Sequence, residues 1–238
     1  MILLALDSCD SRGSLAVLRD GAVLKPIAHE GSSEYSSWLL PNVDAALGAS
    51  GLGMRDVDVF AVAAGPGSFT GVRMGLTTVK AWSEVFGKGI ASVSRLEAMA
   101  AEAVQGNEYV AASFDAHRDQ VYGGLFLRQG AGFSLVEQEM AAAPGDFIRW
   151  VSHHTEKKRV SWISMDPEKL TAQEPWQTRA EAGERVETST SILAPAIGRI
   201  GWQRALQGHL TDALRLDAEY VRRPDAEVFW KGAASRAR

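Results

Sequence analysis

The sequence is poor in cysteine, with Cys9 as the only one among 238 residues. A lone cysteine excludes an intramolecular disulfide and excludes a cysteine-based zinc site within one chain. Such usage fits a reducing compartment, and we expect a cytoplasmic protein. Because the sequence offers no base partner for the Cys9 thiol, we interpret Cys9 as a small residue in a bend rather than as a nucleophile.

Long apolar runs and a large net charge are also missing. No run reaches the roughly 20 residues of a membrane helix. The apolar start at residues 1–5 meets Asp7 and Asp10 too soon for a secretory signal. We therefore expect no membrane partner. A net charge of -4 and a pI near 5.8 provide no bulk attraction to phosphate backbones, so any contact with nucleic acid would be local or indirect.

Two kinds of site signature are lacking as well. No His-x-x-x-His pair brings two imidazoles onto one helix face, so we predict no metal site. The glycine-rich loop at residues 65–71 lacks the Gly-Lys-Ser/Thr of a P-loop, and its glycine spacing differs from the Rossmann fingerprint. The five histidines of the chain, none of which forms such a pair, are His29, His117, His153, His154 and His209.

The first half of the chain predicts one α/β lobe. Apolar runs at 2–6, 14–18 and 22–27, with a tight turn at Asp20-Gly21, indicate a three-stranded meander. The next predicted element is a helix over 33–47, capped by Ser32, Ser33 or Ser36, with Pro41 in its first turn or at a kink. It is followed by a strand at 57–64, a helix over 72–86 ending at Gly87, a strand at 90–93 and a helix over 95–104. We place the lobe boundary near residue 105, giving lobes 1–105 and 106–238.

The second half repeats the opening theme. A strand at 109–114 runs into the polar turn 115–119, and strands at 120–127 and 133–137 follow. A strand that ends in aspartate and continues into two more strands occurs in both halves, so we interpret the fold as one duplicated unit. The remaining predictions are a helix over 144–151, a strand at 159–164, an exposed loop at 167–188, a helix over 192–206 and a basic tail.

The loop Gly65-Pro66-Gly67-Ser68-Phe69-Thr70-Gly71 is the candidate binding segment, because it places glycines and hydroxyls at a helix N-terminus, which favours an anion. The alternative is a tight turn with Ser68 or Thr70 as the N-cap. Asp7 and Asp115 each follow a strand, where a carboxylate can hold a metal-bound water or act only as a turn former. The candidate anion or nucleotide residues are Asp7, Ser8, Gly65, Gly67, Ser68, Thr70, Gly71 and Asp115; no catalytic residue is predicted.

The helix over 72–86 carries two apolar stripes, which one core cannot easily cover. Its second stripe is either buried between sheet and neighbouring helix or is a partner surface. The predicted interface residues are Trp38, Met74, Thr78, Trp82 and Val85. At the other end of the chain, residues 220–224 and Lys231, Arg236 and Arg238 either touch RNA phosphate or form a solvated tail.

Taken together, several segments resemble one known family, the TsaB family, also called YeaZ, of bacterial tRNA threonylcarbamoyladenosine biosynthesis. The segments are Leu4-Ala5-Leu6-Asp7-Ser8, Leu39-Leu40-Pro41, the loop 65–71 continued by Val72-Arg73-Met74-Gly75, the run Asp115-Ala116-His117-Arg118-Asp119-Gln120-Val121-Tyr122, and Tyr220-Val221-Arg222. The likeness is strong over residues 1–125 and at the Tyr220-Val221-Arg222 segment.

The resemblance implies an actin-like fold of two duplicated ribonuclease H-like lobes, related to sugar kinases and Hsp70 ATPase domains. It implies a non-catalytic partner of the catalytic subunit TsaD, which transfers a threonylcarbamoyl group to the adenosine beside the anticodon. Family members pair with TsaD through N-terminal-lobe helices and are joined by the ATPase TsaE, and a homodimer is the expected state alone. ATP or ADP would be held within the complex rather than by this chain, and tRNA would be contacted indirectly.

Three positions depart from the family pattern. Tyr35 stands where the family often has histidine, His117 interrupts an Asp-Ala-Arg run, and Ser164-Met165-Asp166 replaces a glycine-rich turn. The last departure weakens the case for adenosine binding. An independent ATPase using Asp7 and Asp115, or a peptidase, is the alternative; against it stand the missing phosphate-loop lysine and the absence of a nucleophile–base pair. A self-associating module is a third interpretation.

Overall fold

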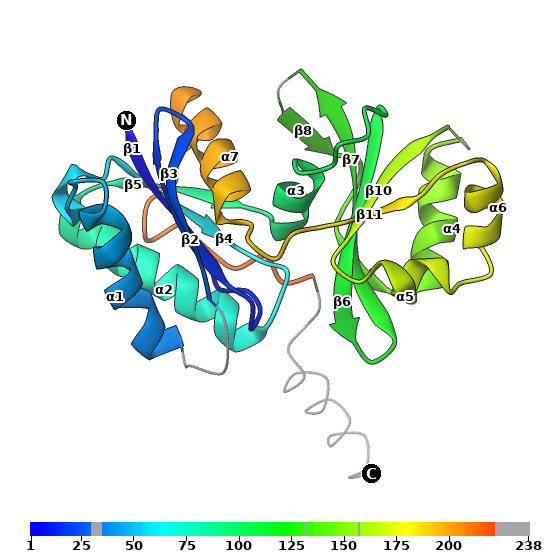
Figure 1. Cartoon of the computed structure of the whole chain (residues 1–238), viewed down its shortest axis with the longest axis horizontal. Helices are drawn as coiled ribbons and strands as arrows, with labels where there is room; N and C mark the ends of the chain where they lie inside the picture. Colours follow the sequence, from blue (N-terminus) through cyan, green and yellow to red (C-terminus); the bar gives the residue numbers. More distant parts are fainter. Residues whose placement is uncertain (30–34, 131, 157, 222–238) are drawn as a thin grey trace, which may run out of the picture.

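The structure, a computed structural model, describes residues 1–29, 35–130, 132–156 and 158–221. Two β-sheets stand side by side, each with helices against its faces (Figure 1). The predicted caps Ser32 and Ser33, the side chain of Ser36 and the basic residues from Arg222 onward lie outside the described residues.

The first sheet has five strands in the order β3-β2-β1-β4-β5. β1, β2 and β3 pair antiparallel, whereas β1, β4 and β5 run parallel. Asp20 and Gly21 at the β2–β3 turn both have positive φ, as the predicted two-residue hairpin requires. The bounds are β1(Ile2–Asp7), β2(Ser14–Arg19), β3(Ala22–Ala28), β4(Val59–Ala63) and β5(Gly89–Val93).

The second sheet repeats this topology, which confirms the duplicated fold. Its order is β11-β10-β6-β7-β8, with a β6–β7–β8 antiparallel meander followed by β10 and β11 parallel to β6. Strand β9 pairs with β7 and has no counterpart in the sequence prediction. The bounds are β6(Tyr109–His117), β7(Gln120–Gln129), β8(Gly132–Leu135), β9(Met140–Ala142), β10(Val160–Ser164) and β11(Val186–Thr188).

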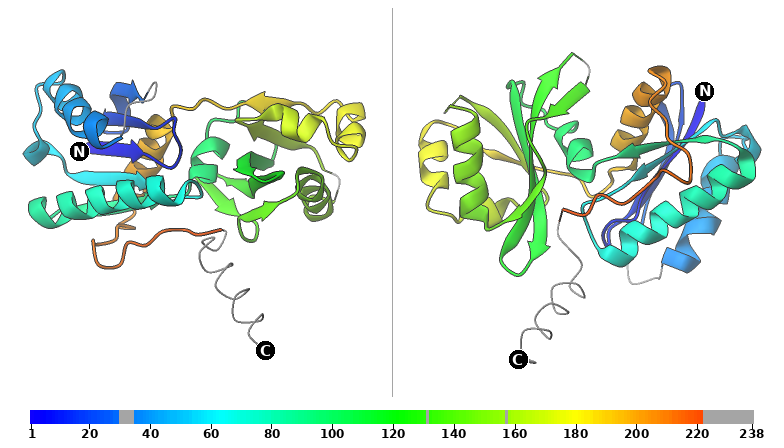
Figure 2. Two further views of the ribbon diagram at one scale, coloured as in Figure 1. Left: turned by 90° about the horizontal axis from the view of Figure 1, so that it is seen from below. Right: turned by 180° about the vertical axis from the view of Figure 1, so that it is seen from behind.

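Helices cover both faces of the first sheet. α1(Tyr35–Gly48) and α2(Phe69–Phe86) lie on one face and α7(Ala194–Leu206) on the other (Figures 1 and 2). α2 begins three residues before the predicted start, after Ser68 as N-cap, and ends at Gly87 in the left-handed conformation, as predicted. Pro41 lies inside α1, beyond its first turn.

The second sheet is covered on its inner face by α3(Arg95–Ala100), which lies between the two sheets (Figure 1). The outer face is covered by α4(Pro144–His154), α5(Pro167–Thr171) and α6(Trp176–Glu181). A 3₁₀ turn at Met54–Asp56 precedes β4. In the described part of the chain, every helix is too short or too polar to cross a membrane.

The prediction of a loop over 167–188 is wrong. α5, α6 and β11 occupy this segment because two of its apolar side chains, Leu170 and Trp176, are buried against the outer core of the second sheet. Pro167 is compatible with this helix because it stands in the first turn, where its missing N–H would have no helical partner. The predicted helix over 95–104 is likewise shorter, ending at Ala100.

Strands β1 to β5 precede residue 105 and strands β6 to β11 follow it, whereas helices α3 and α7 each pack on the sheet from the other side of this point. α7 packs on β1, β2, β4 and β5 of the first sheet. Gly198 and Gly201 permit this close approach: a Cβ on Gly201 would lie 2.7 Å from the Cβ of Ala61, and one on Gly198 would overlap Leu18. The first lobe is therefore completed by a helix from the far end of the chain.

This arrangement predicts that a chain truncated after residue 105 will not fold. Without α7, the apolar face formed by residues such as Leu3, Leu18 and Ala61 would be open to water. We expect aggregation and weak circular dichroism, with soluble structure recovered when a peptide spanning 190–221 is added. A fragment 1–105 that is monomeric and cooperative in urea unfolding would contradict this role for α7.

Candidate functional site

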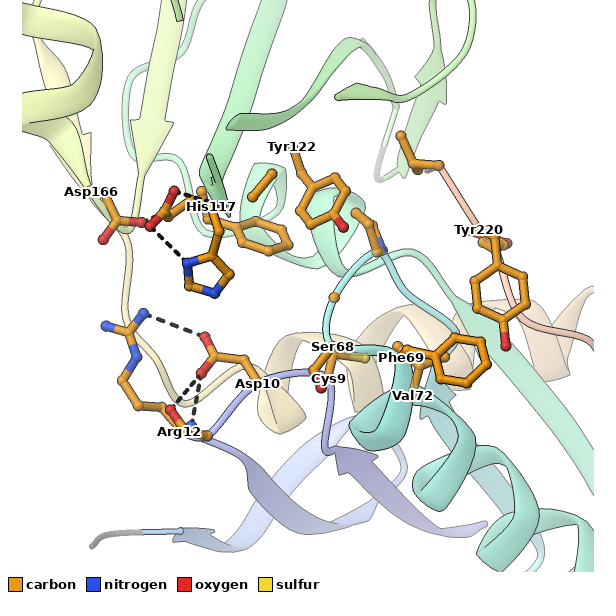
Figure 3. A pocket seen from close by; sticks show the side chains of 18 residues that line it. Cys9, Asp10, Arg12, Ser68, Phe69, Val72, His117, Tyr122, Asp166 and Tyr220 are labelled. Carbon is orange, nitrogen blue, oxygen red and sulfur yellow. Dashed lines mark hydrogen bonds and ion pairs between the residues drawn. The ribbon is translucent and has the colours of Figure 1, made fainter. Parts of the chain in front are cut away.

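A cleft of about 760 Å³ opens between the two lobes. Its walls come from the turn after β1, the glycine-rich loop, the β6–β7 hairpin and the segment after α7 (Figure 3). Asp10 and Arg12 on the first lobe face His117 across it. The cleft thus brings together the two strand ends that the sequence singles out.

The structure places only some of the predicted binding residues in the cleft lining. Gly67, Ser68 and Asp115 line the cleft. The other five, Asp7, Ser8, Gly65, Thr70 and Gly71, are not part of its lining. The glycine-rich loop therefore presents only its central residues to a ligand.

The glycines of this loop serve mainly to pack it against the turn after β1. A Cβ on Gly71 would overlap the carbonyl oxygen of Ser8, and a Cβ on Gly67 would overlap that of Cys9. The Ser68 N–H donates to the Cys9 carbonyl at 2.7 Å, and the Ser8 hydroxyl donates to the Gly71 carbonyl at 2.8 Å. Close backbone approach, rather than phosphate binding, accounts for these glycines.

At the start of α2 the structure agrees with the turn interpretation. The Ser68 hydroxyl accepts from the Gly71 N–H at 3.5 Å, so Ser68 rather than Thr70 is the N-cap. Ser68 and Phe69 still line the cleft, and the positive end of the helix dipole faces it. A weak preference for an anion at this rim remains.

Asp7 is sealed in a buried ion-pair cluster. Its side chain is fully buried, one oxygen lies 3.2 Å from Arg95 Nε, and the other accepts from the Cys9 N–H at 2.9 Å. Arg95 also pairs with Asp10 at 3.2 Å, and its guanidinium lies 4.8 Å from the centre of the Phe114 ring in the second sheet. The cation that neutralises Asp7 therefore belongs to the chain itself.

The electrostatics of the cluster favour the ionised form of Asp10. Burial alone would raise the pKa of Asp10, but the Arg95 guanidinium and the contacts with Arg12 together outweigh burial and lower this pKa to about 2. Burial also raises the pKa of the Cys9 thiol well above its usual value, with Asp7 adding to the effect. A thiol held neutral in this way is no nucleophile, in agreement with the interpretation of Cys9 as a small residue in a bend.

Across the cleft, Asp115 is also neutralised. Its carboxylate lies 3.1 Å from Lys169 Nζ and 3.4 Å from His117 Nδ1, and it accepts from the His117 N–H at 2.9 Å. Burial is outweighed by these partners, so the pKa of Asp115 is lowered. The carboxylate of Asp166, in the segment that departs from the family pattern, accepts the Asp115 N–H at 2.9 Å.

The tip of the β6–β7 hairpin carries backbone strain. His117, Arg118 and Asp119 have φ values of 60°, 55° and 56°, and each of these conformations is uncommon for a residue with a side chain. The hairpin is held in this form by the Asp115 contacts. The cleft is thus lined by two carboxylates with cationic partners, Asp10 and Asp115, and among its described lining residues there is no pairing of a nucleophile with a base.

A second cleft of about 690 Å³ lies beside the first and shares residues 219–221 with it. Its floor gathers Glu97, Glu139 and Glu219 with one cation, Arg204, which pairs with Glu97 at 2.6 Å. The Ser94 hydroxyl donates to Glu139 and so links α3 to the second sheet. Burial raises the pKa of Glu139 to about 7, and repulsion from Glu219 and Glu97 adds to this.

Sequence reasoning missed Arg95, Lys169 and the three glutamates. These residues lie far along the chain from their partners, as Arg95 does from Asp7, so no local sequence pattern predicts the contact. Within the described residues, no group of three or more histidine, cysteine, aspartate or glutamate side chains could hold a metal ion.

The predicted interface residues lie on α1 and α2. Trp38, Met74 and Trp82 are half-buried and pack on the core, with Trp82 against Phe60 at a ring distance of 5.7 Å. Val85 is 74% exposed. Leu40, which the sequence analysis did not single out as a contact, is 56% exposed. The second apolar stripe is thus partly core and partly open surface.

Comparison with known proteins identifies relatives over most of the chain. The sequence model of the TsaD family, tRNA N6-adenosine threonylcarbamoyltransferase, matches residues 27–173. The tRNA threonylcarbamoyladenosine biosynthesis protein TsaB of Haemophilus influenzae is 29% identical, covering 99% of this chain and 98% of its own length. TsaB of Bacillus subtilis is 31% identical over 67% of this chain and 68% of its own length.

Solved structures with a similar fold include a YeaZ protein and a ROK hexokinase. YeaZ from Pseudomonas aeruginosa is 26% identical and superimposes with a TM-score of 0.71, covering 92% of this chain and all of that one. A ROK hexokinase from Thermus thermophilus, at 12% identity and a TM-score of 0.51, shares the fold alone. The predicted actin-like fold of sugar kinases is thereby confirmed.

The buried cluster yields a stability prediction. Arg95→Met would leave Asp7 and Asp10 without their shared cation, and we expect a loss of about 3–5 kcal/mol in urea unfolding. The double variant Asp7→Asn/Arg95→Met should recover part of this loss, because one of the unpaired charges is then removed. An Arg95→Met protein within about 1 kcal/mol of the parent would show that the ion pairs are dispensable.

Glu139 yields a pH prediction. Its pKa of about 7 exceeds the ordinary 4.5, so the folded state holds the proton more tightly than the unfolded state does. The contribution of Glu139 to the free energy of unfolding therefore falls as pH rises from about 4.5 to 7. Glu139→Gln imitates the protonated form and should make the protein more stable at pH 8 than the parent, by on the order of 2 kcal/mol. Glu108→Gln, at an exposed site, is the control. Parallel stability–pH curves for Glu139→Gln and the parent would refute the assignment.

Proposed function

Because the chain belongs to the TsaB (YeaZ) family of tRNA threonylcarbamoyladenosine biosynthesis proteins, we propose that it acts in the cytosol as a non-catalytic subunit that pairs with TsaD. The sealed Asp7 carries this proposal. A kinase-like ATPase needs a free carboxylate at this strand end to position a metal-bound water. In this chain the same carboxylate is fully buried against Arg95.

The rest of the cleft supports a scaffold rather than an enzyme. Asp115 is held by Lys169 and His117, and the loop glycines are used in packing against Ser8 and Cys9. Turnover of a nucleotide would require these contacts to break. ATP or ADP is accordingly held within the assembled complex with TsaD and TsaE, rather than by this chain alone. The independent ATPase and the peptidase are thereby disfavoured.

The outer side of α1 and α2 is the proposed pairing surface. It offers the exposed apolar groups Leu40 and Val85, flanked by the half-buried Trp38, Met74 and Trp82. Thr78, whose hydroxyl donates to the Met74 carbonyl at 2.9 Å, lies between them on α2. TsaD shares the fold and would present the equivalent helices, and a homodimer through the same surface is the resting state of the chain alone.

Charged substitutions on this surface test the proposal. Val85→Glu should weaken pairing at least tenfold without loss of stability, because Val85 is open to solvent and a buried charge is costly at an interface. Trp82 is unsuitable, since its packing on Phe60 would confound folding with binding. Leu206→Glu, at a 62% exposed site on α7 across the sheet, is the matched control.

Pairing is measured as solution mass by size exclusion with light scattering, for the chain alone and mixed with TsaD from the same organism. We expect a dimer that converts to a one-to-one complex, and both species should be lost in Val85→Glu but kept in Leu206→Glu. Full-affinity pairing by Val85→Glu would show that the interface lies on another surface. No complex, together with nucleotide turnover by the chain alone, would favour the independent enzyme.

A further inference from the structure

Two aromatic side chains and one guanidinium form a stack at the rim of the first cleft. Phe69 and Arg73 come from the first turns of α2, and Tyr220 comes from the segment after α7. The Phe69 and Tyr220 rings are stacked with centres 5.7 Å apart and an interplanar angle of 27°. The Arg73 guanidinium lies 3.8 Å from the centre of the Phe69 ring, and its Nε donates to the Tyr220 hydroxyl at 2.8 Å.

This stack, which we call the rim platform, is exposed to solvent. Phe69 is 41% exposed and Tyr220 42% exposed although they pack on each other. Arg73 is itself exposed, and no carboxylate of the described residues lies within ion-pair distance of it. By contrast, Arg12 in the cleft lining and the buried Arg95 are both paired with Asp10.

The chemistry of the rim platform matches a nucleotide. Aromatic faces and a flat guanidinium stack on bases, and a guanidinium with no carboxylate partner is a strong donor to phosphate. The N-terminus of α2, with Ser68 and Phe69 on the cleft wall, adds a positive dipole end beside it. Phe69 and Tyr220 both line the 760 Å³ cleft, so one base has room to lie against them.

The interior of the cleft disfavours a polyphosphate. Asp10 and Asp115 are held by their own cations, and Asp166 and Glu219 also line the cleft, so an inward-reaching polyphosphate would meet carboxylates rather than free cations there. A ligand with one phosphate for each base, held at the rim, avoids this repulsion. A nucleoside triphosphate reaching inward does not.

The sequence that follows the platform favours a polyanion. Residues 222–238 contain Arg222, Arg223, Lys231, Arg236 and Arg238 against only Asp225 and Glu227, although the whole chain has a net charge of -4. The basic excess is therefore attached directly to the segment that carries Tyr220. Such an excess attracts an RNA backbone more strongly than it attracts a single nucleotide.

We propose that the rim platform binds an unpaired nucleotide of single-stranded RNA, with the base stacked against Phe69 and Tyr220 and the adjacent phosphate on Arg73. The proposal rests on the proposed function in that the RNA would be the tRNA loop presented to TsaD. It adds a direct RNA contact by this chain, where the sequence and the family resemblance lead to an indirect one.

The test is a fluorescence anisotropy titration of the complex of this chain with TsaD, using a labelled RNA hairpin with an unpaired loop. Phe69→Leu and Tyr220→Leu should each weaken binding by roughly 10- to 100-fold, the usual loss for one stacked base. Tyr220→Phe keeps the ring and should retain most of the affinity. Arg73→Met should reduce the slope of log K against log salt by about one phosphate contact.

Matched controls come from the second lobe, where Lys158 Nζ lies 5.6 Å from the centre of the Tyr109 ring. Tyr109→Leu and Lys158→Met remove an aromatic ring and a charge from a comparable pair and should leave RNA binding unchanged. A blunt duplex of the same sequence should bind weakly, and AMP and ATP should compete only at far higher concentration than the hairpin. Thermal unfolding of every variant verifies that the fold is kept.

Each other outcome contradicts the proposal. Unchanged hairpin affinity in both Phe69→Leu and Tyr220→Leu would remove the base contact. Competition by AMP at the concentration of the hairpin would assign the platform to a free mononucleotide. Loss of TsaD pairing in these variants would make it part of the protein interface. Failure of RNA binding with intact pairing leaves the proposed function standing, whereas failure of pairing by the parent chain refutes that function itself.

Discussion

The buried cluster of Arg95 with Asp7 and Asp10 is the interaction on which the rest of the structure depends. One guanidinium joins the turn after β1, the start of α3 and the face of Phe114 in the second sheet. The turn held in this way is the surface on which the glycine-rich loop packs, and that loop sets the start of α2. The position of the proposed pairing helix therefore follows from an ion pair at the junction of the two lobes.

The same cluster is the physical basis of the non-catalytic role that we propose for this chain. A buried charge needs a partner, and a carboxylate at the end of β1 can be satisfied by a bound metal or by a side chain of the protein. Here a side chain supplies the positive charge permanently, so no ligand is required to complete the folded state. The glutamates of the second cleft, with one arginine among them, show that the lobes also meet through groups whose charge depends on pH.

Much of the fold could be predicted from local patterns. The alternating apolar runs and the Asp20-Gly21 turn were sufficient for the meander, and Gly87 marked the end of α2. The duplication was predictable because Asp7 and Asp115 lie at the ends of equivalent strands, although β6 extends two residues beyond Asp115. What could not be predicted depends on distant partners: α7 packs on strands nearly 200 residues earlier, Leu170 and Trp176 order a polar segment, and Arg95 meets Asp7 across 88 positions. The glycine-rich loop was recognised, but its glycines pack against a turn that lies almost 60 residues earlier in the chain.

The return of α7 to the first sheet also bears on how the chain is made. The Ala194 N–H donates to the Ser14 hydroxyl, and the Glu219 N–H donates to the Ala64 carbonyl, so the first lobe gains its last contacts only when nearly all of the chain has left the ribosome. Early strands must wait through most of synthesis with one face uncovered, which exposes them to chaperones. A translation product released before α7 is made would then leave the first sheet uncovered on one face, and the proposed pairing helix α2 would lack a stable sheet to pack on.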